Sequence, residues 1–207
     1  TGVDPSALVK GISFADANNG MLVTSNFSGY KVYRTSNGGV SWNGQTLPTS
    51  NGMWAVKYFN PSTAVVCGAS GSMYRTVNGG TNWTQINVGG SYFLTAFSFV
   101  DINTGWVSGG PLKIMKTTNN GVNWTTHTVA PNPGQVADKN HYMVDKTPSS
   151  PYVNRSYCAW TDFGGATDGE VVLRYSTNFG QTWSTNINVS GTLTPLGSAF
   201  AQGNNIQ

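Results

Sequence analysis

Short runs of alternating apolar and polar residues recur along the chain, and each run leads into a corner rich in Asn and Gly. The runs before the corners are Tyr30–Arg34, Ser72–Arg75, Lys113–Lys116 and Val171–Tyr175. A second run of the same kind follows two of the corners, at Trp83–Val88 and Trp124–Val129. Alternation with a period of two predicts half-buried strands, and two such runs joined by Asn and Gly predict a hairpin.

The corners share one eight-residue pattern, Ser/Thr-x-Asn-x-Gly-x-x-Trp. Its constrained residues are Thr35, Asn37, Gly39 and Trp42; Thr76, Asn78, Gly80 and Trp83; Thr117, Asn119, Gly121 and Trp124; and Ser176, Asn178, Gly180 and Trp183. Successive tryptophans of the pattern are 41, 41 and 59 residues apart. A period near 40 predicts a repeat architecture in which each unit buries its apolar face against the next.

The chemistry of the corner residues favours a structural role. Asn tolerates a left-handed backbone and can bond its own main chain two residues on, while Gly accepts a positive φ without steric cost. The Ser/Thr hydroxyl can bind another amide of the turn. The Trp side chain brings a large apolar surface back onto the hairpin and carries an N–H that needs an acceptor.

The four corners resemble the Asp-box, or BNR repeat, with Asn at the usual Asp position. Sialidases, sortilin-type receptors, xyloglucan-cleaving glycosidases and photosystem II assembly-factor propellers carry this box. There it joins the third and fourth strands of a blade, on the face away from the active site. The resemblance implies an all-β β-propeller of four-stranded antiparallel blades. Gly105-Trp106-Val107 resembles the assembly-factor and sortilin type, whereas the fourth repeat resembles secreted bacterial BNR, sialidase-like proteins.

The spacing predicts one domain, 1–207, with blades at about 1–47, 48–88, 89–130 and 131–190. Residues 191–207 are expected to begin a fifth blade, so we expect a fragment of a larger propeller or a partner that completes it. The alternative is a closed five-bladed ring that uses residues 1–8. Four blades and a stub would otherwise leave an open sheet edge.

The fourth repeat is longer than the others, and its extra residues fall at 130–140, 146–155 and 162–170. These segments are rich in Pro, Gly, Asn and Asp. Long loops on a rigid scaffold often carry binding sites. A surface insertion without function is an equally open interpretation.

Composition narrows the classes of partner. The chain has 11 Lys and Arg against 8 Asp and Glu, a formal charge of +3, and no basic run of the kind that nucleic acid binding requires. Its apolar runs are too short to span a bilayer. Low charge, abundant Asn and the BNR resemblance favour a secreted or cell-surface protein. Cys67 and Cys158 are expected on second strands, and two buried thiols are favoured over a disulfide.

The sequence leans against catalysis. The resemblance implies three Arg, a Tyr with a Glu and an Asp for a sialidase, but Arg34 and Arg75 repeat in register with Lys116 as strand-surface residues. Paired carboxylates for glycoside hydrolysis would come from the fourth repeat, from Asp138, Asp145, Asp162, Asp168 and Glu170. Asp16 and Asp101 fall at matching turns and are interpreted as turn formers. His127 and His141 lack a partner at zinc spacing, so no metal site is predicted.

The leading hypothesis is a non-catalytic propeller that binds a glycan or a protein on the face opposite the boxes. The candidate ligand-binding residues are Tyr30, Trp54, Tyr92, Asp138, His141, Asp162 and Phe163. No cofactor is expected, although Asp162, Asp168 and Glu170 leave calcium open. The alternatives are a glycoside hydrolase with part of its active site outside this segment, and an assembly factor for a membrane complex.

Overall fold

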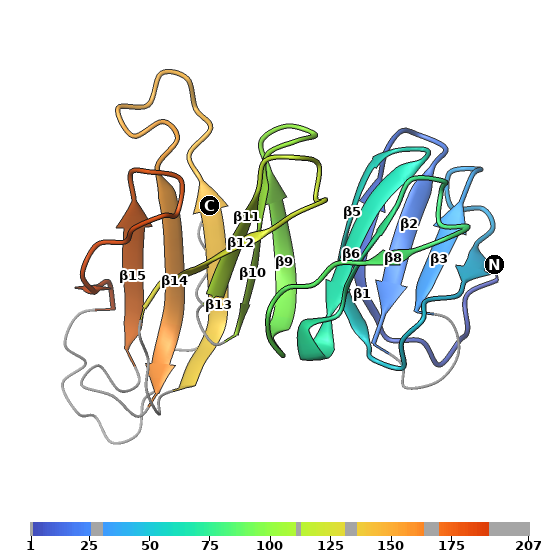
Figure 1. Cartoon of the computed structure of the whole chain (residues 1–207), viewed down its shortest axis with the longest axis horizontal. Helices are drawn as coiled ribbons and strands as arrows, with labels where there is room; N and C mark the ends of the chain where they lie inside the picture. Colours follow the sequence, from blue (N-terminus) through green and yellow to red (C-terminus); the bar gives the residue numbers. More distant parts are fainter. Residues whose placement is uncertain (1, 26–30, 111–112, 131–135, 164–169, 191–207) are drawn as a thin grey trace. The chain divides into compact units, whose positions relative to one another are not determined.

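The computed structural model describes residues 2–25, 31–110, 113–130, 136–163 and 170–190, with the side chains of 136–140 excepted. These residues form four four-stranded sheets, which we call blades 1 to 4 (Figure 1). The chain divides into two compact units, of which the first comprises 1–105 with 117–124 and the second comprises 106–116 with 125–207. The all-β fold expected from the repeat is confirmed.

The strands follow one another in chain order within each blade. Blade 1 has β1 (Val9–Phe14), β2 (Gly20–Thr24), β3 (Val32–Thr35) and β4 (Asn43–Gln45). Blade 2 has β5 (Met53–Asn60), β6 (Thr63–Gly68), β7 (Met73–Thr76) and β8 (Thr84–Gln85), with the short helix η1 (Ala69–Gly71) between β6 and β7. Blade 3 has β9 (Phe93–Phe99), β10 (Gly105–Gly110), β11 (Lys113–Thr117) and β12 (Thr125–Thr128). Blade 4 has β13 (Val136–Val144), β14 (Ser156–Phe163), β15 (Val171–Ser176) and β16 (Ile187–Asn188).

Neighbouring strands run antiparallel in blades 1, 2 and 4, as β11 and β12 do in blade 3. Each blade is therefore an up-and-down meander of strands that are consecutive in the chain. The second strands are the most deeply buried, with all residues of β2 and β6 inaccessible or nearly so. Strands covered on both faces need continuous apolar character, which explains Met21-Leu22-Val23 and Ala64-Val65-Val66.

The four boxes form the same hydrogen-bonded corner. In the second box the Thr76 hydroxyl accepts from the backbone N–H of Asn78 at 3.3 Å and of Gly80 at 2.9 Å, and donates to Asn78 Oδ1 at 3.0 Å. Asn78 Oδ1 also accepts the Asn82 N–H at 2.9 Å. The first, third and fourth boxes repeat all four contacts. The structural assignment of the box residues thus agrees with the local geometry.

Two successive residues in each corner have positive φ. They are Gly38 and Gly39, Gly79 and Gly80, Asn120 and Gly121, and Phe179 and Gly180. The second position is Gly in every box because its φ reaches 74 to 92°, a conformation that a side chain disfavours. The first position tolerates Asn and even Phe, at a strain that the surrounding contacts must offset.

Each of the first three boxes is fixed to the turn between the first and second strands of its own blade. The N–H of Gly38, Gly79 and Asn120 donates to a carbonyl in that turn, at 2.9, 2.8 and 3.0 Å respectively. Box and first turn therefore lie at the same end of the blade. The loops between second and third strands, and the connections that lead to the next blade, lie at the opposite end.

Both cysteines are buried, free thiols on second strands, as predicted. Cys67 lies on β6 and Cys158 on β14, at 0 % and 2 % exposure. Burial raises the pKa of the Cys67 thiol well above its usual value, and it raises the pKa of Cys158 to about 12. Neither thiol is therefore activated as a nucleophile.

The insertions of the fourth repeat differ in part from the prediction. The sequence predicts an inserted loop over 130–140, but β13 begins at Val136 and pairs Ala137 with Asp162. The added residues lengthen this strand pair, which contains an irregular register between Asp138 and His141. The segment after Asp145 forms the expected loop. The predicted fifth-blade start, 191–207, lies outside the described residues.

Candidate functional site

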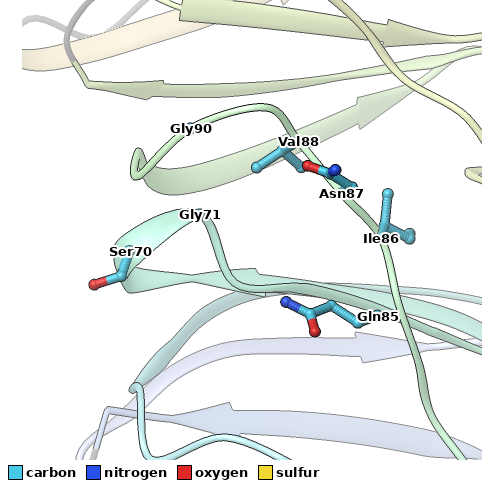
Figure 2. Close-up of a pocket in the computed structure, with 7 residues that line it drawn as sticks. All are labelled: Ser70, Gly71, Gln85, Ile86, Asn87, Val88 and Gly90. Atoms are coloured by element: carbon cyan, nitrogen blue, oxygen red, sulfur yellow. The ribbon is translucent and has the colours of Figure 1, made fainter.

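A groove of about 430 Å³ lies in blade 2, at the end opposite the boxes. One wall is the η1 turn, with Ser70 and Gly71, and the other is the chain that leaves β8, from Gln85 to Val88 and Gly90. Figure 2 shows these residues on two facing segments. The groove follows from topology, because η1 and the connection from β8 to β9 both emerge at this end of the blade.

The two walls of the groove are joined at one end. The Gly71 N–H donates to the Tyr92 carbonyl at 2.6 Å, and the Ile86 N–H donates to the Met73 carbonyl at 2.9 Å. A Cβ added to Gly71 would lie 2.1 Å from the Gly90 carbonyl oxygen, so only Gly allows this approach. Ser70 adopts φ 54°, a left-handed conformation that turns the chain over the groove.

Three aromatic residues lie at or next to the starts of β5 and β9, at the same end of unit 1 as the groove. The Tyr92 ring covers Gly90, where an added Cβ would lie 2.7 Å from Tyr92 Cζ. Trp54 and Phe93 contact each other with ring centroids 6.1 Å apart, and Phe93 is 56 % exposed. The sequence selected Trp54 and Tyr92 for this face, and the structure brings both to the same end of unit 1 as the groove.

The chemistry of the groove is neutral. Its polar side chains are Ser70, Gln85 and Asn87, and none of the seven described residues that line it is ionisable. Asn87 Oδ1 accepts the Gly89 N–H at 2.9 Å, which orients the exposed amide. Paired amides and hydroxyls can donate and accept hydrogen bonds, but they cannot serve as the acid and base of hydrolysis.

The remaining predicted ligand contacts lie elsewhere or lack a described side chain. Tyr30 lies outside the described residues, and for Asp138 only the backbone position on β13 is described. His141 is exposed on β13 and Phe163 is half-buried at the end of β14. Asp162 is only 3 % exposed, and its N–H donates to the Glu170 carbonyl at 2.9 Å. Its carboxylate therefore does not face solvent.

Among the carboxylates proposed as catalytic acids, Asp145 forms a turn. Asp145 accepts from the Thr147 N–H at 2.9 Å and from the Ser150 hydroxyl, and these bonds hold the pKa of its carboxyl below the usual value. Asp16 and Asp101 accept turn amides in the same way, as predicted, and their pKa values are lowered for the same reason. Their carboxyls therefore stay ionised and serve as acceptors.

The described part of the chain contains neither a cluster of metal-ligating side chains nor a membrane-spanning helix. Within it, no three His, Cys, Asp or Glu side chains gather closely enough to hold a metal ion. Asp168, one of the three residues considered for calcium, lies outside the described residues. No helix among the described residues has the length and apolar character needed to cross a bilayer.

The sequence missed the groove itself, because Ser70, Gln85 and Asn87 are ordinary loop residues. The available signal was the interruption of the alternating pattern after Gly68, where Ala69-Ser70-Gly71 replaces the usual hairpin.

Comparison with known proteins supports the fold. The family model of the photosystem II assembly factor YCF48 matches residues 39–138. An ancestral GH74 enzyme matches with a TM-score of 0.65 and 19 % identity over 87 % of this chain and 24 % of its own. The GH74 enzyme of Niastella koreensis matches with a TM-score of 0.56 and 21 % identity over 88 % of this chain and 25 % of its own. YCF48 from Cyanidioschyzon merolae matches with a TM-score of 0.57 and 17 % identity over 88 % of this chain and 57 % of its own.

The chain spans about a quarter of the length of the two GH74 structures. No curated protein sequence matches it significantly. At these identities the structural likeness concerns the fold alone. The four in-register boxes and the four four-stranded sheets are those of an Asp-box (BNR) repeat β-propeller fold, and residues 39–138 are similar to the photosystem II assembly factor YCF48.

Proposed function

We propose that this chain is a non-catalytic part of a β-propeller that binds a partner protein in the groove of blade 2. The observation that carries the proposal is the neutral groove between η1 and Gln85–Gly90, with the Tyr92 ring against Gly90. In a site of this kind a few polar side chains orient the ligand and apolar side chains pack against it, and no side chain reacts with it. It lies on the face that the box resemblance assigns to binding.

An extended segment of protein suits this groove. The strand β8 pairs with β7 only and is the last strand of its sheet, so one edge of its backbone remains available for an added strand. The groove continues directly from β8, and the amides of Gln85 and Asn87 can pair with a peptide backbone there. The match to the assembly-factor family model, over 39–138, includes all the groove residues.

A glycan is the second ligand class, because exposed Phe93 beside Trp54 offers an aromatic surface of the kind on which sugar rings stack. A glycoside hydrolase with acids outside this segment remains the alternative, motivated by the GH74 likeness in fold. The proposal also includes a secreted or cell-surface location and further blades, from this protein or a partner, that complete the propeller.

The test is binding of the purified chain to an array of extended peptides and an array of neutral glycans. We expect Asn87→Asp and Tyr92→Ala to weaken binding about tenfold or more, which corresponds to about 1.4 kcal/mol per contact. Asn87→Asp keeps the acceptor for the Gly89 N–H, removes the donor and adds a negative charge to the neutral groove, and because Asn87 is exposed the fold is retained. Val40→Ala, at a 77 % exposed box residue, is the control and should bind like wild type.

Peptide binding that is lost in both variants and kept in the control supports the proposal. Binding to glycans alone would show that the groove takes a glycan and not a protein segment. Equal affinity of all four proteins for every bound probe would show that the groove is not the site.

A further inference from the structure

A basic side chain links each of the first two blades to the box of the blade that follows. We call the residue directly before each box the latch position, occupied by Arg34, Arg75, Lys116 and Tyr175. Arg75 Nε donates to the Asn120 carbonyl, in the third box, at 2.9 Å. Arg34 Nε donates to the Tyr58 hydroxyl at 3.3 Å, and a Cβ added to Gly79 would lie 3.4 Å from Arg34 Cζ.

The latch position of blade 3 repeats this contact within the second unit. Lys116 Nζ lies 4.8 Å from the ring centroid of Phe179 in the fourth box. The Phe179 carbonyl accepts from Trp106 Nε1 at 3.1 Å. Gly79, Asn120 and Phe179 occupy the same place in their boxes, the first residue of positive φ. The side chain at the latch position thus lies against the same box residue of the next blade three times.

Blade 4 departs from the rule, because its latch position is Tyr175. The Arg155 guanidinium lies 4.6 Å from the Tyr175 ring centroid and 4.5 Å from that of Tyr152. Arg155 and Tyr152 belong to the loop between β13 and β14 of the same blade. A cation therefore still covers the latch, but it comes from a loop of blade 4.

This loop is ordered by its own hydrogen bonds. Asp145 and Arg155 close its base, since the Asp145 N–H donates to the Arg155 carbonyl at 2.9 Å. The Asn154 N–H donates to the Asp145 carbonyl at 2.8 Å, and the Arg155 N–H donates to the Tyr152 carbonyl at 2.9 Å. The matching turns of blades 1 to 3 are much shorter, as at Asp101–Thr104. The added residues thus place Arg155 on the latch.

We propose that the loop 146–155 is a cap that closes the latch of blade 4 against an incoming Asp-box. In blades 1 to 3 the latch position contacts the box of the next blade. In blade 4 the Arg155–Tyr175 contact holds the loop 146–155 against the latch position instead. The cap excludes the boxes of a second copy of this chain from this surface. Heterologous head-to-tail contacts of that kind would otherwise extend without closure.

The first test measures the cover on Tyr175. Nitration of Tyr175 by tetranitromethane, quantified by mass spectrometry, is compared in wild type, Arg155→Ala and Arg155→Lys. We expect a severalfold rise in Arg155→Ala and near wild-type protection in Arg155→Lys, which keeps a cation over the ring. Protection of Tyr175 that is unchanged in Arg155→Ala would show that another segment covers the latch and would overturn the proposal.

The second test measures exclusion of a box. In one variant, residues 146–155 are replaced by Ile-Asn-Thr, the turn of blade 3, and Tyr175→Arg restores a basic latch. We expect its sedimentation-derived mass to rise with concentration, while wild type and Arg155→Lys do not associate further. Circular dichroism and thermal unfolding confirm that the variant is folded. If the uncapped variant does not fold, Arg155→Ala takes its place. A folded, uncapped chain that stays as monomeric as wild type would refute the cap.

Discussion

Thr76→Val will destabilise the protein by about 2 to 4 kcal/mol, because two backbone N–H groups lose their acceptor in a buried corner. Thr76 is 1 % exposed, and its hydroxyl is the acceptor for Asn78 and Gly80. Valine retains the shape of the side chain, so the loss reports on hydrogen bonding and not on a cavity. Equilibrium unfolding in urea measures the change in free energy.

Thr76→Ser is the matched control. Serine keeps the hydroxyl and removes one methyl group, which costs about 0.8 kcal/mol. The fourth box already uses Ser176, with bonds of 3.3 and 2.8 Å to its two amides. If Thr76→Val were as stable as Thr76→Ser, the hydroxyl would not hold the corner.

Trp106→Ala is expected to cost about 3 to 5 kcal/mol, the range for deleting a large buried aromatic side chain. Trp106 is fully buried in the core of the second unit, among Ile114, Val144 and Trp160. Its indole N–H also supports the strained residue Phe179 in the fourth box. The melting temperature and the urea concentration at the midpoint of unfolding should both fall strongly.

Trp106→Phe separates packing from hydrogen bonding at this position. Phenylalanine fills most of the space but leaves the Phe179 carbonyl without the indole donor, so we expect a loss of about 1 to 2 kcal/mol. Equal stability of Trp106→Ala and wild type would contradict the assignment of Trp106 to the core.

The boxes could be predicted from the sequence because their bonds are local. The Thr76 hydroxyl reaches amides two and four residues later, so eight residues contain the whole corner. The period then gave the order of the strands, since each box joins the third strand of a blade to the fourth. The turn role of Asp16 and Asp101 followed from the same register.

The groove and the latches could not be predicted in the same way. The groove depends on the approach of Gly71 to Gly90, which a repeat pattern does not encode. The register predicts Arg34 and Arg75 as strand-surface residues, although a basic residue before each of the first three boxes is the signal of a shared contact. The structural role of Asp145 could not be read from the repeat, because the loop that it closes occurs in blade 4 alone among the described blades. The sequence therefore leaves Asp145 as a candidate catalytic acid. Contacts between repeats are set by packing, and packing appears only in three dimensions.

Residue-resolved amide hydrogen exchange tests the account most directly. The account predicts that the N–H groups of Gly39, Gly80, Gly121 and Gly180 are all protected, and that Thr76→Val removes the protection of Gly80 while the other three keep theirs. Exchange of these four amides at the rate of an unstructured peptide would contradict it, because the hydroxyl-bonded corners would then not define the blades.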